Sequence, residues 1–586
     1  MVQSSQNQSK PENLHYWIRF CAIISAVLFG LQSCADTNEP ATDAPPPADT
    51  VYINGKIITV DDAFSIAQGV AIRDGKFVAV GSSADMQQYV GPETEQVDLN
   101  DRTVIPGLMD AHSHMDGAGT KDVRAQVINA TMVTQAQQII VDFISQKQIP
   151  VGEWVQSSSW HPPSQLQEQR YLTRQEIDAV APDHPVFLRT VGHFAMANSR
   201  ALELAGVDRD TPDPLGGKIY RDENGDATGV LEETAMSLVS SLISPPTYAE
   251  RVAQNIAAQR VYNTAGITSA IVAGLSEEGI QVYKTVAERG QASVRTGVMW
   301  RPSGDSPEEF ENALRNAKFT NNAGDDWVRI AGIKISIDGG MTLRSAYVRD
   351  PYAGEPDNYG TLSVDPDVYK ENVTLANQYG WRVGTHAVGD AAIDIVLDAY
   401  ENASNQSSIR GERFTVIHGS LIAPDQVERA ARLDVRVDAQ NVFMWDKAET
   451  VESYMGLARA IRSVPTKLLV ETLGLENTAA GTDNEVNILN PFIGLYIMVT
   501  RKDPAGKIYG ADQAVTREQA LRLYTSSGPY YTFEEDIKGT IEPGKLADMV
   551  VLSADYLTVP EESIKDITPL QTIVGGKVVY EEAPAQ

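Results

Sequence analysis

Residues 104–115, VIPGLMDAHSHM, decide the predicted fold of this chain. An apolar, partly β-branched run ends there in two histidines, and side chains along a strand alternate between its two faces. One face is therefore expected to carry Leu108, Asp110, His112 and His114, with both imidazoles at the end of the strand. Neutral imidazole is the commonest metal ligand, yet a lone His-x-His is a weak signal. On its own the pair leaves metal binding and a chance surface pair as open alternatives.

Strand-like runs alternate with helical stretches along the rest of the chain. Counting the first run, we predict eight strands, at residues 104–114, 266–274, 293–300, 328–338, 380–386, 412–418, 434–441 and 477–483. Eight βα units indicate a closed barrel that carries its catalytic groups at the carboxyl ends of the strands. We therefore predict an α/β chain with a TIM-like (β/α)8 barrel at residues 105–537.

Two further regions surround the predicted barrel. The first two strands are separated by far more chain than a normal βα loop needs, so we predict an insertion at residues 115–262. One strand-like run inside it, PVFLRTVGH from Pro185, is not counted as a barrel strand. Short alternating strands at residues 50–104 return at residues 538–586, which predicts one composite β-sandwich domain built from both ends of the chain.

The first fifty residues have the character of an export and anchoring segment. The apolar run FCAIISAVLFG at residues 20–30 follows basic residues and is too short for a permanent membrane helix, as in signal peptides. It ends in LQSC, which resembles a bacterial lipobox, so residues 1–34 are the expected signal peptide and Cys34 the expected lipidation site. An ordinary signal peptide with an incidental Cys34 is the alternative. Residues 35–49, rich in Pro, Ala and Asp, are expected to be a disordered tether.

The N-terminal segment and the net charge indicate where the protein is located and which kinds of partner it binds. We expect an exported protein that a lipid anchor holds to the membrane of the bacterial cell envelope, in the periplasm or at the outer membrane. The formal net charge of −30 argues against a nucleic-acid partner, because phosphate binding needs clustered Lys and Arg, which this chain lacks. Both cysteines, Cys21 and Cys34, lie in the predicted signal segment, so the mature body has no internal disulfide. A small molecule is the expected substrate.

The fourth predicted strand, in WVRIAGIKISIDGG, carries an inward lysine. Its apolar odd positions, from Ala331 to Ile337, suit the helix-facing side, which turns Lys334 into the barrel. Burial lowers the pKa of a lysine, and a neutral amine can add carbon dioxide to form a carbamate that bridges two metal ions. An ion pair of Lys334 with Asp338 or Asp483 is the alternative.

Three more strand ends complete a candidate metal site. The fifth and sixth strands end at His386 and His418, where a core histidine bonded to backbone is the alternative, and the eighth presents Asp483. The full candidate set is His112, His114, Lys334, His386, His418 and Asp483. Imidazoles and oxygen anions fix one or two divalent ions with an open position for water. Asp483 is the expected catalytic base, which takes a proton from water and delivers it to a leaving nitrogen.

The ordered motifs VIPGLMDAHSHM, IKISIDGG, GTHAVGD, VIHGS and GTDNEV resemble the amidohydrolase superfamily, specifically its amidohydrolase-3 or YtcJ-like branch. Segments such as KGTIEPGKLADMVVLS extend the likeness from about residue 50 to 580. The resemblance implies attack of a metal-bound hydroxide on a non-peptide C–N bond of an amide, formamide, cyclic amide or amidine. It suggests zinc, although the ligand set is also compatible with manganese, iron or nickel.

The chain departs from the branch at two places. Ile417-His418 stands where members commonly carry Glu-His, and Asp483-Asn484-Glu485 stands where they carry Asp-Ala-Pro or Asp-Trp-Pro. These departures leave the metal residues intact and put inherited substrate preference in doubt.

The insertion and a nearby loop supply candidates for the substrate pocket. His193, in TVGHFAMANS, is the candidate catalytic donor of a hydrogen bond to the oxyanion. Trp160 and Arg344 are candidate substrate contacts, and for Trp160 a packing role is the favoured alternative.

Two other functions remain open at this point. Ester, lactone or phosphoester hydrolysis at the same metal centre is one, because fold and metal do not fix the electrophile. A non-catalytic binding lipoprotein is the other, and it predicts a damaged ligand set.

Overall fold

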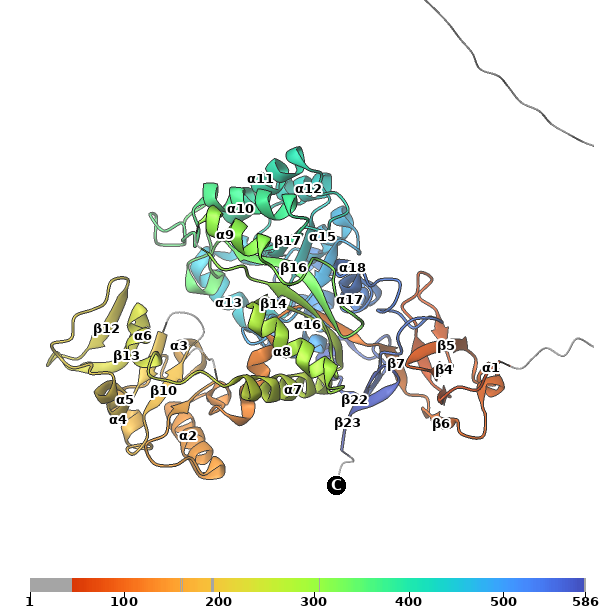
Figure 1. Cartoon of the computed structure of the whole chain (residues 1–586), viewed down its shortest axis with the longest axis horizontal. Helices are drawn as coiled ribbons and strands as arrows, with labels where there is room; N and C mark the ends of the chain where they lie inside the picture. The colour runs from red at the N-terminus through yellow and green to blue at the C-terminus, as the bar shows by residue number, and fades with distance from the viewer. Residues whose placement is uncertain (1–44, 159, 161, 191–193, 305, 584–586) are drawn as a thin grey trace, which may run out of the picture. The chain divides into compact units, whose positions relative to one another are not determined.

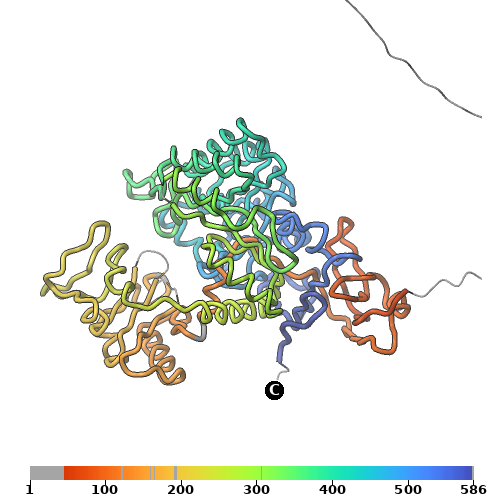
Figure 2. The backbone as a smooth tube through the Cα atoms, viewed as in Figure 1, coloured from red at the N-terminus to blue at the C-terminus, as the bar shows by residue number. Residues whose placement is uncertain are grey.

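The computed structural model describes residues 45–583 except 159, 161, 191–193 and 305, and the side chains of 121, 122 and 164 are also left undescribed. Residues 46–586 form one compact unit, and the following concerns this unit alone. Cys34, the predicted signal segment and His193 lie outside the described residues, so these assignments stay predictions. None of the helices in the described part of the chain is long and apolar enough to cross a membrane. Figure 2 traces the course of the backbone.

The centre of this unit is one sheet of eight parallel strands, and all eight predicted strands are present in it. In sheet order they are β8 (Leu108–Ser113), β14 (Ile267–Leu275), β15 (Arg295–Trp300), β16 (Val328–Ser336), β17 (Val383–Ala387), β18 (Thr415–His418), β19 (Arg436–Ala439) and β20 (Thr478–Ala480). The two edge strands meet just past β20, where the Asp483 N–H donates to the His112 carbonyl at 2.8 Å. The predicted TIM-like barrel is confirmed.

Helices follow the barrel strands and cover the outside of the sheet (Figure 1). Their buried apolar side chains join those of the strands in one large core. The helices between barrel strands, apart from those of the insertion, are α7 (Tyr248–Thr264), α8 (Glu277–Glu288), α9 (Pro307–Arg315), α10 (Pro366–Gln378), α11 (Asp390–Gln406), α12 (Pro424–Leu433), α13 (Phe443–Met455), α14 (Leu457–Arg462) and α15 (Thr466–Leu473). After β20 come α16 (Pro491–Thr500), α17 (Arg517–Leu523) and α18 (Ser527–Tyr531).

Strand β16 breaks the regular alternation on which the inward position of Lys334 was predicted. Gly332 has a φ of 109°, and a Cβ there would lie 2.7 Å from the Arg382 side chain, so only glycine fits. Ala331 packs with apolar residues of β8, β14, β15 and β18, strands that meet only inside the barrel. Its predicted helix-facing position is therefore wrong. Ile333 packs in the outer core, and Lys334 faces inward because the irregularity shifts the strand by one residue.

Strand β8 is irregular as well. Its register with β14 shifts twice, and Leu108 packs in the outer core rather than on the face that presents His112. The prediction that one face carries all four alternate residues of this strand is wrong for Leu108.

The two ends of the chain build a two-sheet β domain, as predicted. One sheet has the order β23-β22-β21-β7-β2-β3, so β7 (Thr103–Pro106) lies between β2 (Lys56–Ile58) and β21 (Met549–Leu552). The sheet also contains β3 (Ile66–Ala67), β22 (Pro569–Val574) and β23 (Lys577–Glu581). The second sheet contains β1 (Thr50–Ile53), β4 (Gly69–Arg73), β5 (Lys76–Gly81) and β6 (Glu95–Asp98). One apolar cluster joins buried residues of both ends.

The folded body begins slightly earlier than predicted. The Ala48 N–H donates to the Tyr89 carbonyl and the Asp49 N–H to the Ile72 carbonyl, each at 2.8 Å. The last residues of the predicted tether at 35–49 therefore belong to the β domain.

A buried ion pair ties the barrel to this β domain. Arg295, at the start of β15, donates from Nε and Nη2 to the two carboxylate oxygens of Asp548, at 2.7 and 3.1 Å. Both side chains are at most 5% exposed. Asp548→Ala leaves the guanidinium buried without its paired carboxylate, so we expect a loss of about 3–5 kcal/mol of unfolding free energy. Urea denaturation measures it.

The matched control is Asp566→Ala, which removes an exposed partner of Lys565. We expect this exposed pair to contribute less than about 1 kcal/mol. Equal denaturation midpoints for the two variants contradict the predicted role of Asp548.

The insertion folds around a sheet of its own, coloured orange to yellow in Figure 1. Its strands are β12 (Gly217–Arg221), β13 (Ala227–Glu233), β11 (Phe194–Ala197), β10 (Val186–Arg189) and β9 (Val155–Gln156), in that order. Its α-helices are α2 (Val133–Lys147), α3 (Pro162–Gln165), α4 (Arg174–Asp178), α5 (Ser199–Leu204) and α6 (Ser237–Ser240). The run from Pro185 is β10 and lies outside the barrel sheet, as predicted. The predicted boundary at residue 262 falls inside α7, which contacts β14.

Candidate metal centre

Three of the predicted ligands form a compact cluster at the carboxyl ends of β8 and β20. His112 Nε2 lies 3.6 Å from Asp483 Oδ1, and His114 Nε2 lies 3.5 Å from the same oxygen. One donor atom from each residue lies within 4.8 Å of the other two. His112 and Asp483 are buried, whereas the His114 side chain is 45% exposed and borders the solvent.

Asp110 holds the two strand ends in this position. Its Oδ1 accepts hydrogen bonds from the Thr482 N–H at 2.8 Å and the His112 N–H at 3.3 Å, and its Oδ2 accepts from the Thr482 hydroxyl at 2.5 Å. A Cβ on Gly481 would lie 2.6 Å from the His112 nitrogen, so the close approach of the strands requires glycine there. The residues next to the candidate ligands therefore position them.

Lys334 reaches this cluster from β16. Its Nζ lies 3.3 Å from His112 Nε2, and the side chain is buried. Neither predicted ion pair is formed within 4.0 Å in the described part of the chain. Asp338 instead accepts hydrogen bonds from the backbone N–H groups of Tyr347, Val388 and Gly389. Burial lowers the pKa of Lys334, which favours the neutral amine that carbamate formation requires.

His386 and His418 extend the cluster from β17 and β18. Their ring centroids are 4.4 Å apart, and the His418 ring lies 5.0 Å from that of His112. His418 Nδ1 lies 2.6 Å from Gln440 Oε1, which fixes Nδ1 as the donor and leaves Nε2 with a lone pair. The structure thus brings all six candidate residues together, and their roles as ligands stay predictions.

The donor set fits a divalent metal ion. His386 Nε2 and Asp483 Oδ1 are buried without a hydrogen-bond partner, although buried polar atoms are nearly always paired. Burial is the main cause that lowers the pKa of His112, which favours the neutral imidazole. Burial likewise lowers the pKa of His114, His386 and His418. Unpaired nitrogen and oxygen atoms among imidazoles that favour the neutral form suit the binding of a divalent cation.

Two polar residues at the carboxyl end of β19 belong to the site but were not predicted from the sequence. Asp438 Oδ2 lies 4.0 Å from His112 Nδ1, and Gln440 Nε2 donates to Asp438 Oδ1 at 3.2 Å while its Oε1 binds His418. The signal was present in VRVDAQN, where polar residues stand at a strand end that corresponds to the others. Arg301, directly after β15, was also missed. After burial and Lys334, its charge contributes to the lowered pKa of His114.

Gln440→Ala is expected to weaken metal binding. It removes the acceptor that orients His418, and loss of such a partner typically costs about 10–100-fold in metal affinity. Competition with a chromogenic chelator measures the change. The control is Gln378→Ala, which breaks a surface hydrogen bond to Gln406. Wild-type affinity in Gln440→Ala would disprove the orienting role.

The structure does not bring the other predicted substrate contacts to this cluster. Trp160 is 1% exposed and packs in the core of the insertion, which is the packing alternative. The Arg344 guanidinium forms an ion pair with Glu355 and stacks 4.0 Å from the ring centroid of Tyr454. Among the described interactions, neither residue contacts the six candidate ligands.

A TIM-like barrel whose strand ends present neutral imidazoles, a lysine and an aspartate defines a metal-dependent hydrolase. Comparison with protein families agrees: residues 95–580 match the amidohydrolase family, and the chain belongs to this family.

Similar proteins indicate to which branch of this family the chain belongs. It is 28% identical to the putative amidohydrolase YtcJ of Bacillus subtilis (strain 168), over 91% of this chain and 99% of that one. It is 28% identical to the N-substituted formamide deformylase of Arthrobacter pascens, over 91% and 98%. An uncharacterized metal-dependent hydrolase from Pyrococcus horikoshii OT3 has a similar structure, with a TM-score of 0.70 and 25% identity over 88% and 99%. The chain is thus a hydrolase of the YtcJ-like branch that acts on C–N bonds other than peptide bonds, as the sequence motifs predicted.

Proposed function

We propose that this enzyme hydrolyses the C–N bond of a small N-substituted amide, formamides included, at the six-residue cluster. The observation that carries the proposal is the convergence of His112, His114 and Asp483, whose donor atoms lie within 4.8 Å of one another at the carboxyl ends of barrel strands. The name of the Arthrobacter pascens relative supports the amide class. Cyclic amides and amidines have the same type of bond and belong in the same test.

The residues of the cluster have distinct roles in the proposed reaction. A divalent ion held by them, which we propose to be zinc, would polarise the substrate carbonyl and lower the pKa of a water molecule. Asp483 accepts the proton from the attacking water as the new C–O bond forms. It then donates this proton to the leaving nitrogen as the C–N bond breaks, which yields a carboxylic acid and an amine. Burial raises the pKa of Asp483, and this suits proton transfer near neutral pH.

The test combines metal analysis of the purified protein with matched substrate pairs. N-benzylformamide and benzyl formate differ in the scissile bond, and cyclic amides and N-acyl amino acids extend the panel. We expect one or two equivalents of metal and a higher kcat/KM for the amide than for the ester. A preference for esters throughout would favour the ester, lactone or phosphoester alternative. A metal-free protein without turnover would favour a non-catalytic binding protein.

A further inference from the structure

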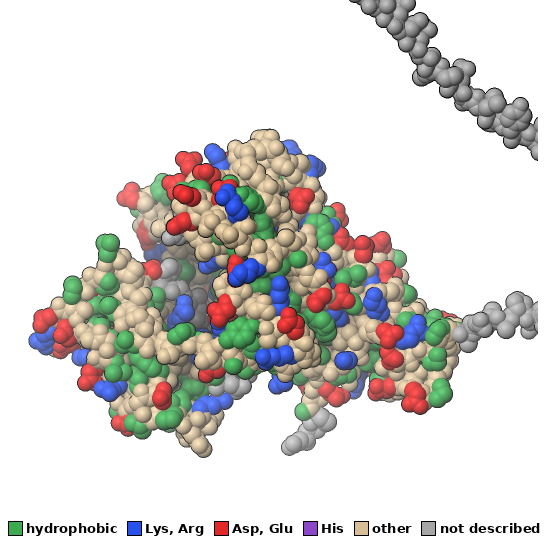
Figure 3. All heavy atoms as spheres, viewed as in Figure 1, with side chains coloured by type: hydrophobic (Ala, Val, Ile, Leu, Met, Phe, Trp, Pro, Cys, Tyr) green, Lys and Arg blue, Asp and Glu red, His purple; other side chains and the backbone are tan. Residues whose placement is uncertain are grey.

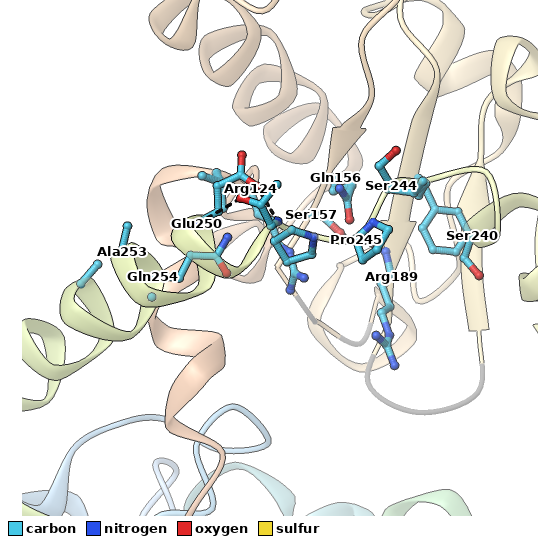
Figure 4. Close-up of a pocket in the computed structure, with 17 residues that line it drawn as sticks. Arg124, Gln156, Ser157, Arg189, Ser240, Ser244, Pro245, Glu250, Ala253 and Gln254 are labelled. Atoms are coloured by element: carbon cyan, nitrogen blue, oxygen red, sulfur yellow. Dashed lines mark hydrogen bonds between the residues drawn. The ribbon is translucent and has the colours of Figure 1, made fainter. Parts of the chain in front are cut away.

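A cavity of about 770 Å³ lies where the insertion meets η2 (Met115–Asp122) and α7, and Figure 4 shows the residues around it. Pockets for small molecules typically measure about 300–1,000 Å³. None of the six candidate ligands is in its lining. One wall of the cavity nevertheless belongs to the segment that follows a candidate ligand, because η2 begins directly after His114 and contributes Gly119 to the lining.

Two arginines in the cavity lining lack a counter-ion. Arg124, which follows η2, and Arg189, which ends β10, both line the cavity, and neither has a carboxylate within 4.0 Å in the described part of the chain. Arg124 is half-buried; burial, with a contribution from the like charge of Arg189, lowers its pKa. Among the described lining residues there is one carboxylate, that of Glu250, which accepts hydrogen bonds from the Thr247 N–H and hydroxyl at the start of α7. The described part of the lining therefore carries more positive than negative charge.

Glu485 connects the wall of the cavity to the metal centre. It is the second residue after Asp483, and its carboxylate packs so closely on Gly117 of η2 that a Cβ there would lie 1.2 Å from Oε1. Among the described residues, neither Arg124 nor Arg189 pairs with Glu485 within 4.0 Å, so the guanidinium N–H donors in the cavity lining remain available.

We propose that this cavity binds a carboxylate of the substrate, remote from the scissile bond, through Arg124 and Arg189. The inference rests on the proposed function and names the substrate class: amides that carry a carboxylate at the far end. Each guanidinium offers a planar fork of N–H donors that matches a carboxylate. Gln156 and Ser157 add polar groups beside them (Figure 4), and the lining also contains the apolar side chains of Val123, Phe187 and Ile243.

The kinetic test compares N-formyl-6-aminohexanoate with N-formylhexylamine, a neutral analogue that keeps the scissile formamide. In Arg124→Gln and Arg189→Gln we expect the KM of the carboxylate substrate to rise about 10–100-fold, as loss of one charge-assisted contact predicts. The KM of the neutral analogue should rise much less than that of the carboxylate substrate, and its continued turnover shows that the variants fold. The control is Arg170→Gln, an exposed arginine of the insertion that pairs with Glu176. Equal losses for both substrates, or none, overturn the proposal.

A binding experiment separates this inference from the proposed function. 4-Phenylbutyrate and 4-phenylbutan-1-ol contain no C–N bond, so calorimetry with the holoenzyme reports binding without turnover. We expect the acid to bind at least tenfold more tightly than the alcohol, to lose this advantage in Arg124→Gln, and to inhibit competitively. Absence of amide hydrolysis with intact acid binding refutes the proposed function alone. Amide hydrolysis with equal binding of acid and alcohol, or with non-competitive inhibition, refutes the carboxylate subsite alone.

Discussion

His112→Ala is expected to release the metal and to lower kcat/KM by about a thousandfold or more. His112 Nε2 lies 3.3 Å from Lys334 Nζ and 3.6 Å from Asp483 Oδ1, so its removal opens the centre of the cluster. A residue that only orients a ligand already contributes about 10–100-fold to metal affinity, and a ligand itself contributes more. Metal analysis after gel filtration, together with kinetics on the best amide, measures both effects.

His184→Gln is the matched control for this variant. His184 is also a buried histidine, but it lies in the insertion, where Nδ1 is 3.3 Å from the Glu153 carbonyl. We expect its metal content to equal that of the wild type. Full metal content and activity in His112→Ala would refute the metal centre.

Asp483→Asn is expected to lower kcat by about 10²–10⁴-fold with a smaller change in KM, because it removes the proton acceptor and keeps the shape of the side chain. The remaining amide oxygen is a neutral and therefore weaker donor, so we expect part of the metal to be retained. Metal content and kcat are measured on the same preparation.

An exposed aspartate provides the control for this substitution. The Asp367 side chain is 95% exposed on α10, and Asp367→Asn should leave kcat unchanged. A kcat of Asp483→Asn within tenfold of the wild type, with metal bound, would show that another group moves the proton.

The barrel could be predicted because each strand is an apolar run followed by small or polar residues. This pattern can be recognised in the sequence alone. The candidate ligands could be predicted for the same reason: His386, His418 and Asp483 all stand where such a run ends. Asp438 and Gln440 occupy the equivalent place on β19, but Asp and Gln are common at loop starts, so only their contacts with His112 and His418 distinguish them.

Other features depend on backbone conformation or on distant contacts. The inward position of Ala331 follows from the positive φ of Gly332, which hydrophobic periodicity does not reveal. Arg124 and Arg189 are far apart in the sequence and come together at the cavity only through tertiary structure. Trp160 packs in the core of the insertion, which is the alternative that the sequence favoured over a substrate contact.

The order of strands in the composite sheet has a consequence for biogenesis. β7 pairs with β2 from its own half of the chain and with β21 from far along the sequence, so one edge of β7 stays open until β21 has been synthesised. Contacts of such high sequence separation form slowly, and an unpaired strand edge invites association with other chains. This sheet therefore cannot be completed before β21 emerges from the ribosome, and until then the open edge of β7 is exposed to association with other chains.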